Sequence, residues 1–237
     1  MAENKGSSNG EESMLTEFDL MYMGRSYARL QLYREALEKW GLVGKNNILD
    51  AGCGYGAWTY ALSKLNGFVV GVEKDERKAG LAIDVVEENA GNTEIYNCDI
   101  EHLHNQSYAD EHFDGILCFH TIYYTQNWQQ TLESLASLMT PGGIMYINIA
   151  TKACFLYMAQ SIDETTKKMG IDALNNERRK AKGIEYSTEN GIPIDQMKFE
   201  EELNKLELAT LWRGSDEVAH HPGVIGYVVR KCTHNDM

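Results

Sequence analysis

A glycine-rich turn near residue 50 is the segment of this chain best suited to holding a ligand. It contains Gly52, Gly54 and Gly56. The turn follows the apolar run Ile48-Leu49 and precedes a helical pattern that begins near Trp58. A glycine turn between a strand and a helix presents backbone N–H groups and a helix N-terminus without Cβ atoms in the way. Dinucleotide-binding turns follow the similar pattern G-x-G-x-x-G/A, so the glycines alone predict only a nucleotide-like ligand.

Acidic residues around this turn narrow the kind of ligand. Asp50 lies two residues before the first glycine, where its carboxylate would repel a pyrophosphate but attract an ammonium group. Glu73 lies 23 residues beyond Asp50, near the offset of about 20 residues at which an acid binds a ribose diol. The pair therefore favours a ligand that combines a positive charge with a ribose.

Histidines supply the candidates for proton transfer. His120 is the leading candidate for a general base, because imidazole titrates near neutral pH. The alternative is a histidine that only hydrogen-bonds the backbone or a ligand. His220 and His221 are weaker candidates, since the following Pro222-Gly223 is equally typical of an exposed turn.

Short apolar runs alternate with helical patterns from residue 48 onward, and this alternation positions the polar residues. The predicted strands lie at 48–49, 67–72, 94–96, 115–119, 144–149, 208–213 and 224–230. The predicted helices lie at 30–40, 58–64, 76–89 and 128–139. Pro141-Gly142-Gly143 predicts a tight turn before the fifth strand, with glycine at a positive φ. Such alternation predicts a parallel sheet with helices on both faces and ligands at the carboxyl ends of the strands.

The domain organisation follows from length and local composition. Residues 1–13 are polar and rich in Gly and Ser, which predicts a flexible tail. We expect one domain over residues 14–237, since 237 residues suit a single α/β core. Within it, residues 14–44 form an N-terminal helical cap. Residues 151–205 form a helical insertion after the fifth strand that can act as a lid.

Composition excludes several partner classes. The formal net charge of −13 argues against nucleic acid, which is bound through clustered Lys and Arg, and favours a small uncharged or cationic substrate.

No apolar run approaches the ~20 residues of a membrane span. The five cysteines have no metal-ligand spacing, so we expect reduced thiols and no metal. The N-terminus lacks the apolar core of a secretory signal, which predicts a cytoplasmic protein. Monomer and homodimer stay open.

Five segments together resemble the successive motifs of class I, Rossmann-like methyltransferases that use S-adenosylmethionine and act on small molecules. In chain order these segments are Leu49-Asp50-Ala51-Gly52-Cys53-Gly54-Tyr55-Gly56, Val72-Glu73, Asn97-Cys98-Asp99-Ile100, Phe113-Asp114-Gly115-Ile116-Leu117-Cys118 and Leu138-Met139-Thr140-Pro141-Gly142-Gly143. The resemblance implies a three-layer sandwich around a mostly parallel seven-stranded sheet with an antiparallel last strand.

The resemblance also implies roles for individual residues. The turn from Gly52 to Gly56, with Asp50, would hold the methionine part of S-adenosylmethionine, and Glu73 would bind the ribose hydroxyls. Asp99 and Ile100 would hold the adenine. Cys118, at the end of the fourth strand, completes the cofactor-binding set from the core motifs. Asp114 matches an acidic position of the family that we do not assign to catalysis.

Two further groups would surround the reacting centre. Tyr22, Arg25 and Tyr27 belong to an N-terminal segment rich in aromatic and methionine residues, which would fold across the cofactor as in similar enzymes. Plain helix packing is the alternative for each of them. The acceptor side would be formed by Tyr22, His120, Tyr123 and Tyr124.

The predicted function is methyl transfer from S-adenosylmethionine to an oxygen or nitrogen atom of a small metabolite, such as a natural product or sugar. A protein or RNA methyltransferase is the alternative within enzymes. A non-catalytic protein that binds S-adenosylmethionine is the alternative of another class, because fold does not fix function.

Overall fold

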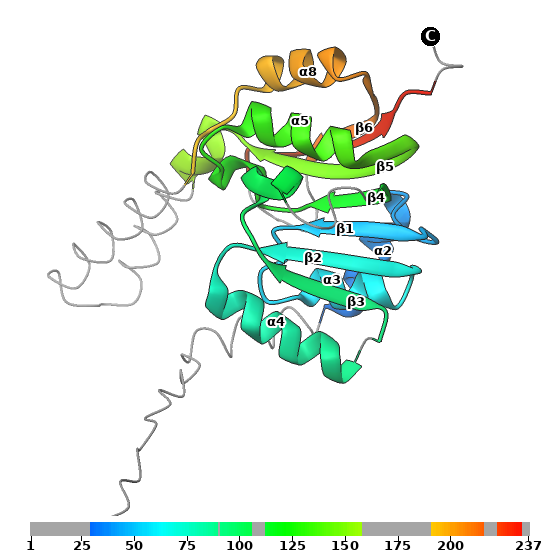
Figure 1. The fold of residues 1–237 in the computed structure, drawn as a ribbon. Helices are drawn as coiled ribbons and strands as arrows, with labels where there is room; N and C mark the ends of the chain where they lie inside the picture. Colours follow the sequence, from blue (N-terminus) through cyan, green and yellow to red (C-terminus); the bar gives the residue numbers. More distant parts are fainter. Residues whose placement is uncertain (1–28, 90, 106–111, 158–190, 216–221, 234–237) are drawn as a thin grey trace, which may run out of the picture.

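The computed structural model describes residues 29–89, 91–105, 112–157, 191–215 and 222–233 (Figure 1). Its strands are β1 (Asn47–Ala51), β2 (Phe68–Glu73), β3 (Thr93–Asn97), β4 (Phe113–Cys118), β5 (Met139–Ala150), β6 (Leu208–Ser215) and β7 (Val224–Lys231). Its helices are α2 (Leu30–Lys39), α3 (Ala57–Ser63), α4 (Glu76–Asn89), α5 (Trp128–Leu138) and α8 (Gln196–Lys205), with the short 3-10 helices η1 (Ile100–Asn105) and η3 (Ile122–Tyr124). The seven strands and four helices that were predicted with residue ranges are confirmed, with differences at their ends.

The described strands form one seven-stranded sheet in the order β3-β2-β1-β4-β5-β7-β6. Strands β1 to β5 pair in parallel, and β7 is antiparallel to both of its neighbours, β5 and β6. Figure 1 shows the parallel strands side by side, from β5 at the top of the view to β3 at the bottom. The predicted Rossmann-like architecture with an antiparallel last strand is confirmed.

Consecutive strand residues point to opposite faces of the sheet, and each face has its own core. Ile48 and Leu117 belong to the core shared with α2 and α3. Their neighbours Leu49 and Ile116 belong to the core shared with α5 and α8. Because both faces are covered, the strands read as nearly continuous apolar runs. Polar side chains that could bind a ligand are therefore expected at the ends of the strands.

The segment Pro141-Gly142-Gly143 differs from its prediction. The positive φ is confirmed at Gly142, which has φ 80°. The segment is not a turn before the fifth strand, however, because β5 begins at Met139, directly after α5. Met139 pairs with Phe113 and Ile144 with Gly115, so β5 advances further than β4 between these pairs. The extra residues form a bulge inside β5.

Several predictions fall on residues that the structure does not describe. The tail at 1–13 and most of the cap at 14–44 lie outside the described ranges, where only residues 29–44 of the cap are seen. Of the insertion at 151–205, residues 151–157 and 191–205 are described. The bounds of the single domain and of the lid therefore stay predictions. None of the described helices has the length and apolar character needed to cross a membrane.

Candidate active site

Asp50 is the second-to-last residue of strand β1, just before the glycines, where the parallel strands end. It is only 1% exposed, and Thr59 Oγ1 on α3 donates a 2.6 Å hydrogen bond to its Oδ2 atom. Burial raises the pKa of Asp50 from 3.8 to about 7, against the lowering effect of the Thr59 bond and with a further contribution from the charge of Glu73. A buried carboxylate of this kind is stabilised in its charged form by a nearby cation.

The glycine turn that follows is held by the end of β2. The amides of Gly52 and Cys53 both donate to the carbonyl of Val72, at 2.8 and 2.9 Å. Gly52, Gly54 and Gly56 all have positive φ, at 85°, 57° and 80°. A Cβ added at Gly52 would lie 2.3 Å from Thr121 side-chain atoms, whereas one added at Gly54 would meet nothing within 4 Å. The turn thus packs tightly at Gly52 and faces open space at Gly54.

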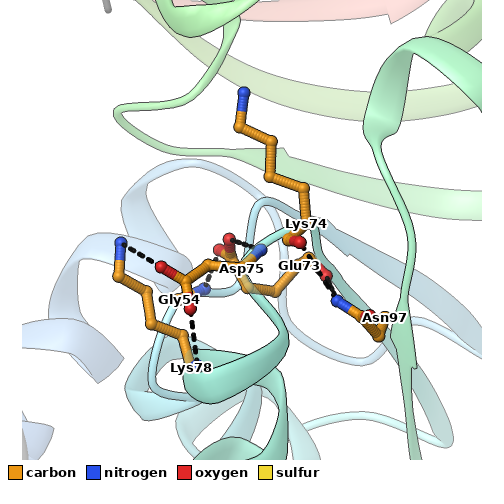
Figure 2. A network of polar contacts seen from close by, with 6 residues as sticks. All are labelled: Gly54, Glu73, Lys74, Asp75, Lys78 and Asn97. Atoms are coloured by element: carbon orange, nitrogen blue, oxygen red, sulfur yellow. Dashed lines mark hydrogen bonds and ion pairs between the residues drawn. The ribbon is translucent and has the colours of Figure 1, made fainter.

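Glu73, the last residue of β2, reaches back to this turn. Its Oε2 accepts a 3.0 Å hydrogen bond from the Gly54 amide, and its Oε1 accepts a 2.9 Å bond from the Asp75 amide (Figure 2). Each carboxylate oxygen can accept a second hydrogen bond. The two backbone amides therefore aim the carboxylate while leaving it able to accept from two hydroxyl groups.

The end of β3 lies beside Glu73. The side-chain amide of Asn97 donates to the carbonyls of Glu73 and Lys74, at 2.9 and 3.1 Å, which ties β3 to β2 (Figure 2). Asp99 follows, half-buried, and its Oδ1 accepts a 3.1 Å bond from the Glu101 amide. Ile100 is buried at 5% exposure, at the start of η1. The acidic Asp99 and the apolar Ile100 thus follow the strand, β3, that pairs with the strand of Glu73.

His120 follows β4 in an unusual backbone conformation. Its φ is 54°, in the left-handed region that few residues other than glycine adopt. The His120 amide donates a 2.7 Å hydrogen bond to Oδ1 of Asn148, which is fully buried on β5. The His120 Nδ1 atom hydrogen-bonds the hydroxyl of Tyr123, and the Phe119 ring packs edge-on against the imidazole at 4.4 Å.

The remaining predicted residues of the β4 end differ in exposure. Tyr124 is half-buried, and its carbonyl accepts a 3.4 Å bond from Lys74 Nζ, which joins the end of β2 to η3. Cys118 has no exposed surface and lies in the α5 core, where burial raises the pKa of its thiol to about 12.

Asp114 lies at the other end of β4, where its carboxylate accepts hydrogen bonds from the amides of Asn46 and Asn47. It holds β1 beside β4, away from the glycine turn.

The structure therefore brings together the acids at the ends of β1, β2 and β3, the glycine turn, and His120 with Tyr123 and Tyr124 beyond β4. The predicted site residues Tyr22, Arg25, Tyr27, His220 and His221 lie outside the described residues. Among the described side chains, no group of three or more His, Cys, Asp or Glu could hold a metal ion.

Three contacts of the site were not predicted from the sequence. Asn148 binds the His120 amide, and the only local signal for it is a polar residue in the apolar run Ile144 to Ile149. Thr59 donates to Asp50 from the first turn of α3, and nothing in the neighbouring sequence marks it. Lys74 reaches η3 across 50 residues of sequence, which no spacing rule predicts.

Sheet order, glycine turn and strand-end acids together define the class of this protein, the Rossmann-like α/β domains of the methyltransferase type. Residues 42–203 match the family model of the methyltransferase domain. The chain belongs to that family.

Several curated proteins that this chain resembles are ubiquinone biosynthesis O-methyltransferases. The protein from Coxiella burnetii is 31% identical over 121 residues, which are 49% of this chain and 48% of the relative. The mitochondrial protein from Dictyostelium discoideum is 27% identical over 143 residues, which are 55% of this chain and 44% of the relative. The chain thus spans about half the length of the curated relatives it matches.

Solved structures share the fold at low sequence identity. Magnesium protoporphyrin IX methyltransferase from Synechocystis, crystallised with bound SAH, has a TM-score of 0.60 at 13% identity, with 92% of this chain and 89% of that chain covered. N-methyltransferase NodS from Bradyrhizobium japonicum has a TM-score of 0.55 at 15% identity, with 91% and 99% covered. The [4+2]-cyclase SpnF has a TM-score of 0.61 at 14% identity, with 86% and 81% covered.

Proposed function

We propose that this protein transfers the methyl group of S-adenosylmethionine to an oxygen or nitrogen atom of a small molecule. The observation that carries the proposal is the buried Asp50 carboxylate at the start of the glycine turn. Burial disfavours the charged form of Asp50 when no cation is near. A ligand ammonium group beside Asp50 and the Asp50 carboxylate therefore stabilise each other. A pyrophosphate in the same place would be repelled. Asp50 therefore favours S-adenosylmethionine over a dinucleotide.

The other strand ends fit the remaining parts of the cofactor. Glu73 keeps acceptor capacity on both oxygens, which suits the two hydroxyls of a ribose. Asp99 offers acceptor oxygens and Ile100 an apolar surface, which suits the amino group and ring of adenine. The open space beside Gly54 leaves room for the methionine part. We assign no contact to the Cys118 side chain, since it packs among the apolar side chains of the α5 core.

S-adenosylmethionine supplies an electrophilic methyl group on a positively charged sulfur. The residues of the chain have to bind it, exclude water and place the acceptor atom about 3 Å from the methyl carbon. His120 is the proposed base for a protonated acceptor. Its imidazole takes the proton while the acceptor lone pair bonds to the methyl carbon and the electrons of the broken C–S bond stay on sulfur.

The acceptor is proposed to be a small molecule. The net charge of −13 disfavours a polyanion such as RNA, and the relatives named above are O-methyltransferases of ubiquinone biosynthesis. Tyr123 and Tyr124, beside His120, are the proposed acceptor contacts. The oligomeric state and a cytoplasmic location stay predictions.

The reaction needs its own test, because the fold also occurs in the [4+2]-cyclase SpnF. Isothermal titration should detect binding of S-adenosylmethionine and S-adenosylhomocysteine and no comparable binding of NAD. Isotopic methyl transfer to a panel of phenols, alcohols, amines and carboxylates then separates an enzyme from a binding protein. Tight NAD binding without a response to either sulfur compound would overturn the cofactor proposal.

A pair of glutamate variants sharpens the binding test. Glu73→Ala should weaken S-adenosylhomocysteine binding by roughly 10-fold or more, since hydrogen bonds to a charged group are worth about 1.5–3 kcal/mol. Glu94→Ala is the matched control, because Glu94 is exposed on the neighbouring strand β3. Equal affinities of the two variants would remove Glu73 from the cofactor site.

A further inference from the structure

The cluster of His120, Tyr123 and Asn148 has features that packing alone does not require. Asn148 is a fully buried amide within an apolar strand, and His120 adopts a left-handed backbone. A left-handed non-glycine residue costs on the order of 1–2 kcal/mol and persists only where its surroundings enforce it. Such strain collects at functional sites.

Asn148 holds the His120 backbone through a hydrogen bond to its amide. Its Oδ1 accepts the His120 amide at 2.7 Å. The contact joins the loop after β4 to the carboxyl-terminal part of the last parallel strand, β5, 28 residues away in sequence. The bond satisfies the buried amide oxygen and fixes where the His120 Cα lies.

Tyr123 fixes the imidazole ring. Its hydroxyl bonds His120 Nδ1 from η3, three residues further along the chain, and Tyr123 itself is only 3% exposed. The Phe119 ring also contacts the imidazole, with an edge-to-face geometry at an interplanar angle of 90°. A histidine held at backbone, ring edge and ring nitrogen has a defined orientation.

We propose that Tyr123 and Asn148 are positioning residues that hold His120 with its proton on Nδ1, so that Nε2 is the atom that accepts the proton of the methyl acceptor. The proposal rests on the proposed function. The partner of one imidazole nitrogen sets which nitrogen carries the proton. In the proposed tautomer Nδ1–H donates to the Tyr123 oxygen, which requires the Tyr123 hydroxyl proton to point to a different acceptor.

The proton balance follows from this arrangement. In the transfer step the acceptor O–H or N–H proton passes to Nε2, which leaves an imidazolium with protons on both nitrogens. The Tyr123 oxygen accepts from Nδ1–H before and after the step, so the ring does not have to turn. Release of the Nε2 proton to water restores the starting state.

The test is the imidazole nitrogen spectrum of the full chain labelled with 15N-histidine, measured without any ligand above the histidine titration range. In the unchanged protein, the His120 resonances, assigned by their absence in His120→Ala, should show protonated Nδ1 and unprotonated Nε2. Protonated Nε2 with unprotonated Nδ1 would overturn the proposal. This result does not depend on turnover, so it stands or falls separately from the proposed function.

Two phenylalanine variants separate positioning from packing. Tyr123→Phe should lose the Nδ1–H pattern and lower kcat by roughly 10-fold with an unchanged KM for S-adenosylmethionine. Tyr227→Phe is the matched control, since it removes a buried hydroxyl that donates to Glu200 on α8 instead. It should leave the His120 spectrum unchanged. An unaltered His120 spectrum in Tyr123→Phe would also overturn the proposal.

Discussion

At the scale of single residues, the chemistry of this protein concentrates on a few side chains that are costly to hold where they are. Asp50 is a nearly buried acid with a raised pKa, and His120 has a left-handed backbone. Neither feature improves the stability of the free protein. Both features are explained if the two residues act on a bound ligand. Both can be tested by stability measurements that need no substrate.

Replacing Asp50 by Asn should stabilise the ligand-free protein at high pH. The native pKa of about 7 lies above the ordinary value of 3.8, so the folded state binds the proton more tightly than the unfolded state between these values. The stability of the unchanged protein therefore falls as pH rises from about 4 to about 7, by up to roughly 2–4 kcal/mol. Asn carries no charge and avoids this loss.

Urea unfolding at pH 5, 6, 7 and 8 measures this effect as the stability difference between Asp50→Asn and the unchanged protein. The difference should be smallest at pH 5 and grow in favour of the variant up to pH 8. The same variant should bind S-adenosylmethionine more weakly at pH 8. A difference that stays constant with pH would contradict the raised pKa.

His120→Gly should be more stable than His120→Ala. Both variants lose the imidazole, but only glycine adopts φ of 54° without a steric cost. The expected gap is about 1 kcal/mol in the free energy of unfolding. Thermal or urea unfolding of the two variants side by side measures it, and equal stabilities would mean that residue 120 is not held in the left-handed region.

At the scale of elements, the glycine turn between β1 and α3 combines two requirements in one segment. Gly52 has to let Thr121 approach, because a Cβ there would lie 2.3 Å from the threonine side chain. Gly54 has no such neighbour within 4 Å, and its amide instead donates to Glu73. The first glycine serves the packing of the β1 end against the β4 end, and the second faces the proposed cofactor.

Alanine substitutions should separate these two roles. Gly52→Ala should lower the free energy of unfolding by roughly 2–4 kcal/mol through overpacking and a strained φ. Gly54→Ala should lose only about 1 kcal/mol from its positive φ, yet bind S-adenosylhomocysteine more weakly. Unfolding curves and titration of both variants check this, and the reverse order of stabilities would refute the roles.

At the scale of the whole molecule, one sheet separates two cores that share its strands. Trp40, Trp58 and Trp212 belong to or pack against the core with α2 and α3, whereas Trp128 belongs to the core with α5. Neither core keeps its packing if the sheet is lost. The described part of the chain should therefore unfold as one unit, in line with the predicted single domain.

A Trp128→Phe variant tests this cooperativity. Its tryptophan fluorescence then reports the α2 and α3 core, while far-UV circular dichroism also follows α5 and α8. The two signals should give the same urea midpoint, as a two-state transition requires. Separate midpoints would show that the two faces unfold independently.

Most of the fold was predictable because its signals are local. The alternation of apolar runs with helical patterns predicted the seven strands of the sheet and the helices α2 to α5, since a parallel sheet covered on both faces leaves such runs. It did not predict α8 or the short helices η1 and η3 as separate elements. The bulge at Pro141-Gly142-Gly143 was misplaced, because proline and glycine mark a positive φ but not whether the chain pairs on either side of it. Strand pairing depends on the neighbouring strand, here β4.

The sequence by itself determined the family, the glycine turn, and the acids Asp50, Glu73 and Asp99, because residues after parallel strands must meet at one edge of the sheet. Only the tertiary structure decided what those residues experience. The burial that raises the pKa of Asp50 comes from packing on all sides. The bonds of His120 to Asn148 and Tyr123 depend on how β5 and η3 lie beside the β4 end. Contacts between distant residues and burial are properties of the packed chain, and local spacing does not encode them.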